Sequence, residues 1–197
     1  MSQNPALIAL VCFNNFLTEL DVSQNPALKY LLCYNNQITK LDMSRNPKLF
    51  SLWCYNNELT ELNVSRNPVL NQLSASNNKL TELDVRRNRE IVFLDCDSNK
   101  LTRLNVRRNR ALKGLNCSVN QLTKLNMRKN TLLKELSAEY NLFTADALND
   151  LFKTLHSNGQ RGLGLHIRVA NNPGSAYCDP NIAKRKGWIV YIDNEPF

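Results

Sequence analysis

The chain repeats itself every 21 residues. In the stretch LLCYNNQITKLDMSRNPKLFSLWCYNNELT, residues 31–60, one copy of a leucine, a cysteine and an asparagine is followed 21 positions later by the next, as Leu31, Cys33 and Asn36 and then Leu52, Cys54 and Asn57. A fixed period of this length indicates a stack of supersecondary units, each of which buries its apolar face against its neighbours.

Three columns of equivalent positions run through seven copies, from Met1 to about Ala147. The first column holds a cysteine or an alanine: Cys12, Cys33, Cys54, Ala75, Cys96, Cys117 and Ala138. The other two hold asparagine without a break: Asn15, Asn36, Asn57, Asn78, Asn99, Asn120 and Asn141, and Asn4, Asn25, Asn46, Asn67, Asn88, Asn109 and Asn130. Seven copies in one register, with no insertion, predict a regular solenoid.

Each copy contains the same short template twice, about ten residues apart. Leu31 and Cys33 are two residues apart, so on an extended segment both side chains face the core. Asn36 follows where the chain must turn, and its amide can bond backbone groups of a neighbouring coil that would otherwise be buried unpaired. We therefore expect two short extended sides and two turns in every coil.

The pattern LxxLxCxxNxLxxLDVSxNP resembles that of bacterial leucine-rich repeats of the nested 21-residue kind, the IRREKO type, over residues 1–147. The segment NNPGSAYCDPNIAKRKGWIVYI is similar to the closing segment of bacterial proteins with such repeats. The resemblance implies an α/β repeat fold, a right-handed parallel β solenoid, and a role in binding. It also implies a secreted or cell-surface location.

The pattern divides the chain into two parts, seven repeats over residues 1–147 and a small C-terminal α/β cap over residues 148–197. Thr144 is placed to cap a helix, and the following apolar residues recur at helical spacing. We expect the cap to hold a helix, a strand, a short helix and a final strand, because an uncovered last coil would expose its core and an open sheet edge.

The six cysteines predict neither disulfides nor a metal site. In-register neighbours on parallel strands lie about 4.8 Å apart, too far for the usual disulfide, and alanine fills the same position at Ala75 and Ala138. A free cysteine behaves as a small apolar residue. No CxxC pair occurs and the chain has only two histidines, so we expect the five cysteines of the column to be reduced and buried.

A candidate binding face follows from the positions that alternate with the buried strand residues. The aromatic and apolar residues at these positions are Phe13, Tyr30, Leu32, Tyr34, Trp53, Tyr55 and Phe93. Exposed aromatic residues are enriched in interface hot spots, and tyrosine and tryptophan also suit sugar stacking. The alternative is that these rings pack on one another or on coils before residue 1. Farther along, Asp95, Asp97, Glu135 and Glu139 make the same face acidic.

A second candidate face is basic. Its columns contain Arg86, Arg107 and Arg128 beside Arg45, Arg66, Arg87, Arg108 and Lys129. Residues 64–147 carry fifteen basic and eight acidic side chains, so most of the net charge of +8 comes from the later coils. Such columns could bind a linear polyanion resembling heparin, or they could simply be a solvated face. No aromatic residues interleave with the arginines, which argues against nucleic acid as the partner.

The leading hypothesis is a non-catalytic module that binds a protein or a glycan through the strand face. The alternatives are an anion binder that uses the arginine columns and the recognition arm of a larger enzyme or effector. The sequence offers no recognisable nucleophile–base pair and no cofactor motif. It also has no apolar run of membrane-spanning length and no signal peptide. Since Ser2-Gln3-Asn4-Pro5 matches Ser23-Gln24-Asn25-Pro26, the pattern begins in the middle of a repeat, and we expect a longer parent protein.

Overall fold

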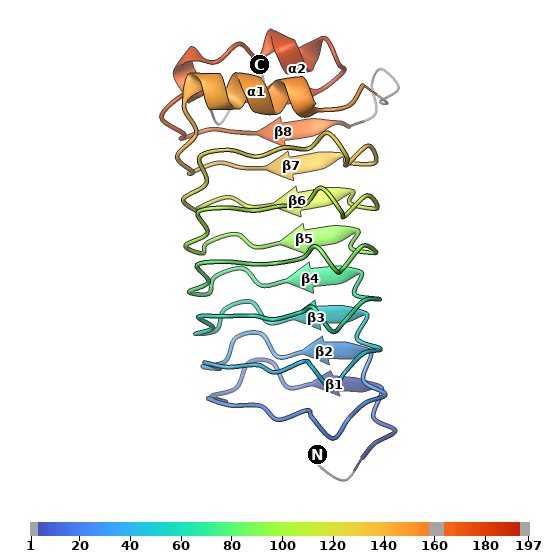
Figure 1. Ribbon diagram of the computed structural model, residues 1–197. Helices are drawn as coiled ribbons and strands as arrows, with labels where there is room; N and C mark the ends of the chain where they lie inside the picture. Colours follow the sequence, from blue (N-terminus) through green and yellow to red (C-terminus); the bar gives the residue numbers. More distant parts are fainter. Residues whose placement is uncertain (1–3, 158–163, 194–197) are drawn as a thin grey trace.

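The computed structural model describes residues 4–157 and 164–193. Over these residues the chain winds into an elongated stack of coils, with the N-terminal coil at one end and the helices at the other (Figure 1). The result is a parallel β solenoid, as the repeat predicts.

Within the described residues, a parallel sheet of nine short strands runs the length of the stack, in sequence order. The strands of the repeats are β1 (Ala9–Val11), β2 (Tyr30–Leu32), β3 (Ser51–Trp53), β4 (Gln72–Ser74), β5 (Phe93–Asp95), β6 (Gly114–Asn116) and β7 (Glu135–Ser137). Each pairs with the next at equivalent positions, so that Leu31 faces Leu52 and Leu52 faces Leu73. Paired residues on neighbouring strands are therefore 21 positions apart, which is the period of the sequence repeat.

The remaining elements close the C-terminal end. They are α1 (Ala145–Thr154), β8 (His166–Arg168), the 3-10 helix η1 (Ser175–Tyr177), α2 (Asn181–Lys184) and β9 (Ile189–Tyr191). Thr144 caps α1 as predicted, because its hydroxyl accepts a hydrogen bond from the Ala147 amide at 3.3 Å. Since β7, β8 and β9 pair in one sheet, the cap continues the solenoid. The predicted division at residues 147 and 148 falls within α1 and stays a prediction.

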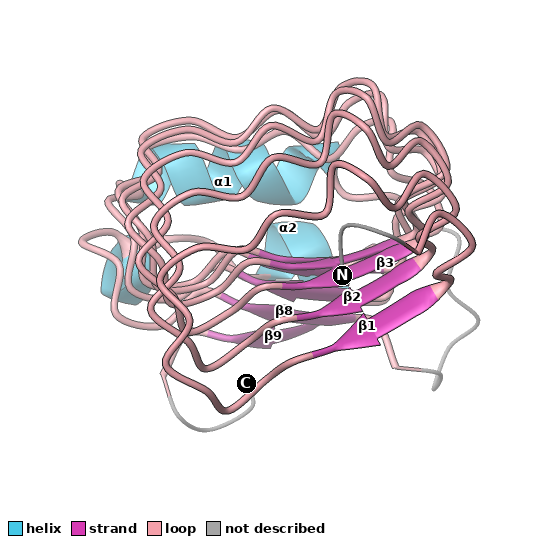
Figure 2. Ribbon diagram, turned by 90° about the horizontal axis from the view of Figure 1, so that it is seen from below, coloured by secondary structure: helices cyan, strands magenta, loops and turns pink. Residues whose placement is uncertain are grey.

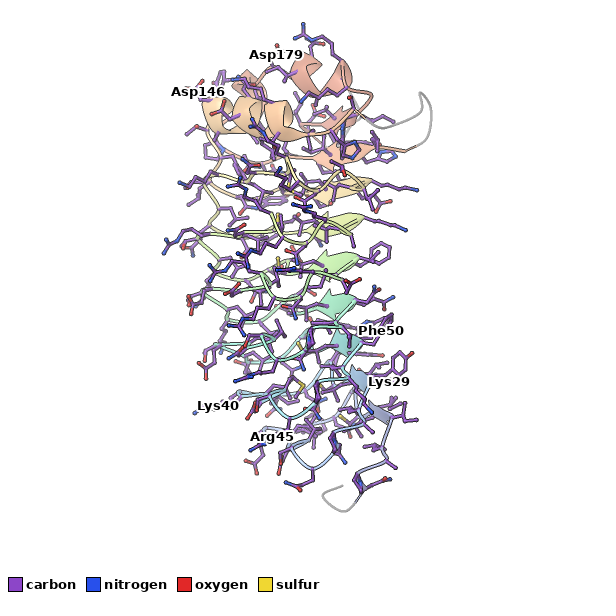
Figure 3. The ribbon with its side chains drawn as sticks, turned by 45° about the vertical axis from the view of Figure 1, so that its right-hand side comes forward. Lys29, Lys40, Arg45, Phe50, Asp146 and Asp179 are labelled. Carbon is purple, nitrogen blue, oxygen red and sulfur yellow. The ribbon has the colours of Figure 1, made fainter. Side chains whose placement is uncertain are left out.

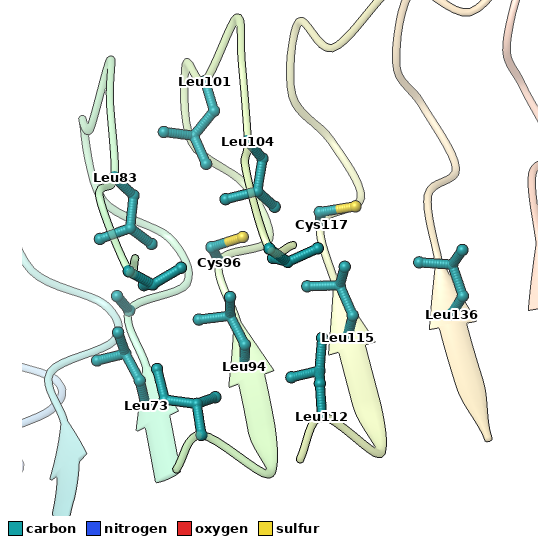
Figure 4. Packing of buried hydrophobic residues seen from close by; sticks show 14 of the residues in the cluster. Leu73, Leu83, Leu94, Cys96, Leu101, Leu104, Leu112, Leu115, Cys117 and Leu136 are labelled. Carbon is teal, nitrogen blue, oxygen red and sulfur yellow. The ribbon is translucent and has the colours of Figure 1, made fainter. Parts of the chain in front are cut away.

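The core is a continuous apolar column inside the coils. In Figure 4, leucines of successive strands, such as Leu94 and Leu115, point inward next to Cys96 and Cys117. All four side chains are buried. Viewed along the stack, the strands occupy one side of each coil while loops form the other sides (Figure 2).

The asparagine column that contains Asn57 provides hydrogen-bond partners for backbone groups at the turn after each strand. The Asn57 amide nitrogen donates to the carbonyl oxygens of Cys33, Cys54 and Tyr55 at 3.0, 3.1 and 3.2 Å. Its Oδ1 accepts from the Ile38 amide at 2.9 Å. Asn57 thus joins its own coil to the preceding one, which is the role that the sequence predicts.

The cap reproduces this turn with unrelated residues around it. Asn172 donates to Ala138 and Val169, at 3.0 and 2.8 Å, and its Oδ1 accepts from the Asn141 amide at 3.1 Å. Asn171 adopts a left-handed φ of 59°, as Asn14 does in the first coil with 55°. The last turn is therefore built like a repeat, although α1 separates it from coil seven.

Candidate functional site

The outward strand face is formed by three positions in each coil. The middle residue of every repeat strand points into the core. The residues directly before and after it, and the third residue after it, face outward. Leu52, for example, is fully buried, whereas Trp53 beside it is 37% exposed. Successive coils repeat this alternation and line these positions up as three columns along the sheet.

Three of the predicted site residues form a stack of rings. The Phe13 and Tyr34 rings lie 4.4 Å apart at 8°, and the Tyr34 and Tyr55 rings lie 4.4 Å apart at 9°. All three side chains are half-buried. The packing alternative raised by the sequence therefore describes part of the face, since these rings cover one another.

The other predicted residues leave more of their surface open. Tyr30 is 42% exposed and contacts Phe50 edge-on, with ring centroids 6.1 Å apart. Trp53 lies 6.3 Å from the Tyr34 ring at a tilt of 45°. Phe93 is 52% exposed, two coils farther along, while Leu32 is half-buried. The structure thus separates Phe93 from the N-terminal aromatic cluster.

A depression of about 480 Å³ runs along the strand face from Trp53 on β3 to Glu135 on β7, with Phe93 near its middle. The coils on either side of Phe93 contribute the small residues Ser74 and Gly114 to it. Its lining is Trp53, Tyr55, Gln72, Leu73, Ser74, Phe93, Leu94, Asp95, Gly114, Leu115, Asn116, Glu135 and Ser137. The depression combines three of the predicted aromatic residues with carboxylates from the acidic half of the face.

Gly114, which is not among the predicted site residues, shapes this depression. A Cβ at this position would lie 2.9 Å from Phe93 Cδ1, so the absence of a side chain lets the Phe93 ring fold over the next strand. The sequence contains a signal for this role, because Gly114 is the only glycine among the outward repeat positions. Its importance depends on the Phe93 rotamer, which the sequence does not reveal.

Hydrogen bonds hold the acidic side chains in place. The Ser118 hydroxyl donates to Glu139 at 2.7 Å, and the Ser98 hydroxyl donates to Asp97 at 2.9 Å. Burial raises the pKa of the Asp97 carboxyl above its ordinary value; the Ser98 bond opposes this shift and the neighbouring Asp95 carboxylate adds to it. The C-terminal half of the face is therefore polar and anionic.

The arginine columns lie on a different side of the stack. In Figure 3, Lys40 and Arg45 project away from the strand side, where Lys29 and Phe50 lie. The predicted basic residues Arg86, Arg87, Arg107, Arg108 and Arg128 are all exposed. Arg86 pairs with Asp84 at 2.7 Å, and its hydrogen bonds lower the pKa of that carboxyl to about 2.

A second depression, of about 680 Å³, lies over these columns. Five arginines, one glutamate and short residues of two coils line it: Ser44, Pro47, Ser65, Arg66, Pro68, Arg86, Arg87, Arg89, Glu90 and Arg108. Arg107 and Arg128 do not contribute to this lining. The structure thus brings together only part of the predicted basic set.

The cysteines are all free. Cys33, Cys54, Cys96 and Cys117 are fully buried. Burial raises the pKa of the Cys54 thiol to about 12. The prediction of five buried thiols is wrong for Cys12, which lies in the first described coil and is partly exposed.

The described residues offer neither a metal site nor a membrane-spanning helix. Within residues 4–157 and 164–193, no three histidine, cysteine or acidic side chains gather in a way that could hold a metal ion. Over the same part of the chain, none of the helices has the length and apolar character needed to cross a membrane.

The sequence of one coil matches a known repeat. Residues 76–91 match the family described as Leucine Rich repeat. The coils also superimpose on solved structures of this architecture. The functional domain of InlJ from Listeria monocytogenes, a structure that includes a cysteine ladder, is 31% identical with a TM-score of 0.78. The fold is a leucine-rich repeat.

Two further leucine-rich-repeat structures show the same fold. A leucine-rich-repeat protein of Leptospira interrogans is 24% identical with a TM-score of 0.75, over 93% of this chain and 47% of that one. The internalin InlF of Listeria monocytogenes is 21% identical with a TM-score of 0.75, over 87% of this chain and 50% of that one. The match to InlJ covers 96% of this chain and 44% of that chain, so this chain spans less than half of that length. No curated protein sequence matches the chain.

Proposed function

We propose that the protein is a non-catalytic recognition module whose strand face binds another protein, or a glycan, at the depression that Trp53 and Phe93 line. Leucine-rich-repeat folds typically serve protein–protein recognition. The observation that carries the proposal is the exposure of two large aromatic side chains around one concavity of the strand face. Aromatic anchors next to a recess are the usual centre of a protein interface.

The proposal extends to the type of repeat and to the parent protein. We assign the coils to the nested 21-residue type, because each holds the same template twice and the sheet keeps the 21-residue register. The match to InlJ covers 44% of that chain, which supports a longer parent protein.

Both histidines have structural contacts in the cap, which supports a non-catalytic role. The His156 ring nitrogen lies 2.7 Å from the Leu133 carbonyl oxygen, and the ring packs edge-on against Trp188. His166 Nδ1 lies 3.2 Å from the Tyr191 hydroxyl. Neither histidine lines the depression that contains Trp53 and Phe93.

The test is to probe arrays of proteins and glycans with the folded protein and to measure the affinity of one bound partner. Trp53→Ala should weaken binding by about 2 kcal/mol or more, as central aromatic anchors do. The melting temperature should change little, because the side chain lies outside the core. Phe16→Ala is the matched control, since Phe16 is 85% exposed and does not line the depression. Unchanged binding together with a much lower melting temperature would show that Trp53 serves packing alone.

A second candidate function is supported by the arginine-lined depression. Five guanidinium groups around one concavity, against the carboxylate of Glu90, suit a polyanion such as a sulfated glycan. Heparin affinity should then decrease steeply with salt and be lost in the Arg87→Glu/Arg108→Glu variant. Lys40→Glu/Lys124→Glu removes the same charge outside this depression and should have a much smaller effect. Equal losses in the two variants would indicate attraction to net charge alone.

A further inference from the structure

The outward strand face is acidic, although the chain as a whole is basic. The chain has 25 basic and 17 acidic residues. Three outward positions in seven coils give 21 positions, of which none is basic and four are acidic: Asp95, Asp97, Glu135 and Glu139. A basic protein whose seven repeat strands carry no lysine or arginine at their outward positions favours a positively charged partner there.

The depression brings this charge together with aromatic surface. Asp95 and Glu135 line the same concavity as Trp53, Tyr55 and Phe93. A carboxylate alone attracts any cation weakly, because exposed ion pairs are screened by water and salt. A ring next to the carboxylate adds a cation–π contact and excludes water from it. A carboxylate beside a ring therefore selects a cationic side chain better than the carboxylate or the ring would alone.

Arginine fits this combination better than lysine does. Its planar guanidinium can lie flat on a ring while its N–H groups bind a carboxylate in a two-pronged geometry. The same sheet already contains one guanidinium–ring contact, because the Arg168 guanidinium lies 4.8 Å from the centre of the Tyr191 ring in the cap. The outward surface of these strands can thus hold a guanidinium against a ring.

We propose that the depression receives a flexible, positively charged segment of a partner protein, whose arginine side chain stacks on Phe93 between the carboxylates of Asp95 and Glu135 while a neighbouring apolar residue of the segment contacts Trp53. This inference rests on the proposed function and names the partner's chemistry.

Other charged groups border the depression without lining it. Lys113 and Lys134 directly precede β6 and β7 and are exposed, and Arg168 follows in β8 next to Ser137. None of the three belongs to the lining, whose charged groups are Asp95 and Glu135. A bound arginine would therefore meet two carboxylates inside the depression and cations only at its margin.

The experiment selects binders from a random library of displayed peptides and then measures their affinities in solution. The wild-type protein should enrich peptides that contain arginine beside an apolar residue. The Asp95→Asn/Glu135→Gln variant keeps the shape of both side chains and should lose this enrichment. The Arg87→Glu/Arg108→Glu variant should retain it, because those residues lie on the basic side of the stack.

A double-mutant cycle sharpens the test. Replacing the peptide arginine with citrulline, a neutral isostere, should weaken binding to the wild type by about three- to tenfold. The same replacement should change the affinity for Asp95→Asn/Glu135→Gln very little. Raising the salt concentration should reduce the difference between the arginine and citrulline peptides on the wild type.

Three outcomes would overturn the inference, and they differ in what they imply for the function. Peptides without basic residues that lose binding in Trp53→Ala would show that the depression is a site but does not select cations. Selected peptides that bind Trp53→Ala as well as the wild type would refute both the inference and the proposed site. An equal citrulline effect in the wild type and in Asp95→Asn/Glu135→Gln would also overturn the inference.

Discussion

The two buried asparagine columns look alike in the sequence but differ in their hydrogen bonds. In the column that contains Asn57, both the amide nitrogen and Oδ1 have partners. In the other column, Asn67 donates to Met43 and Asn46 at 3.0 and 2.8 Å. Among the described residues its Oδ1 has no hydrogen-bond partner, and the same holds for Asn46, Asn88, Asn109 and Asn130. The two columns should therefore contribute unequally to stability.

Asn57→Ala should destabilise the protein more than Asn67→Ala does. The first change leaves the Ile38 amide buried without its acceptor, which costs about 1–3 kcal/mol. The second leaves carbonyl groups that still accept backbone bonds, since Met43 accepts from Asn46 and Asn46 accepts from Leu49. It also removes the unpaired Oδ1. Denaturant unfolding of both variants measures the difference, and a larger loss for Asn67→Ala would contradict this assignment.

Val119 occupies a backbone position that suits asparagine better. Its φ is 49°, and the equivalent residues in the first four coils are all asparagine with φ between 48° and 55°. A left-handed conformation costs a β-branched residue about 1–2 kcal/mol. Val119→Asn should therefore raise the free energy of unfolding by about 1 kcal/mol, because the side chain is 45% exposed and loses little packing. The measurement is denaturant unfolding, and Val119→Thr, which stays β-branched, should show no such gain.

At the scale of elements, the cap depends on one close approach. Gly174 lies so near the start of α1 that a Cβ there would be 2.0 Å from the Ala145 nitrogen. Its amide donates to the Phe143 carbonyl at 2.9 Å, which fixes the segment before η1 against the beginning of the helix. The contact joins parts of the cap that are about 30 residues apart.

Gly174→Ala should destabilise the cap severely, by about 3 kcal/mol or more, because the obstructing atoms belong to the backbone. Gly187→Ala is the matched control. Gly187 has a φ of 88° and open space around its Cβ position, so alanine there meets backbone strain without a clash. Thermal unfolding of both variants distinguishes a steric cause from a conformational one. Equal losses would mean that the close approach relaxes easily.

The repeat made most of the elements predictable. Fixed columns such as Asn15 to Asn141 set the strand register, and the capping residue Thr144 placed α1. The 3-10 helix η1 was missed because Ser175–Tyr177 carries no periodic pattern. At the site, alternation identified which aromatic residues face outward. Ring stacking among Phe13, Tyr34 and Tyr55 and the fold of Phe93 over Gly114 depend on rotamers, which periodicity does not determine.

At the scale of the whole molecule, the two ends of the stack are unequal. Helices and two strands cover the C-terminal coil, whereas the core residues Leu7, Leu10, Cys12 and Leu17 of the first coil are only partly buried. In a solenoid each coil is stabilised by its neighbours, so the coil whose core residues are least buried should open most readily.

Thiol labelling should follow this asymmetry. Cys12 should react in the native protein, because it is partly exposed, although burial raises the pKa of its thiol somewhat. Cys33, Cys54, Cys96 and Cys117 should react only after unfolding, since both access and thiolate formation are suppressed. Mass spectrometry of protein labelled for increasing times gives the order. Labelling of Cys96 as fast as Cys12 would contradict a uniformly packed interior.

The hydrogen bonds between coils give the stack a direction of mechanical weakness. The Cys33 amide donates to the Trp53 carbonyl oxygen, and the Asn35 amide donates to the Tyr55 carbonyl oxygen. These bonds therefore point along the axis of the solenoid. A force that pulls the two ends apart would act parallel to these hydrogen bonds. It would stretch the bonds between one pair of coils at a time, rather than shear the bonds of many coils together. Coils would then detach one after another, each releasing about 70 Å of extended chain. Tethered by its ends, this protein would act as an extensible element that lengthens in equal steps at modest load.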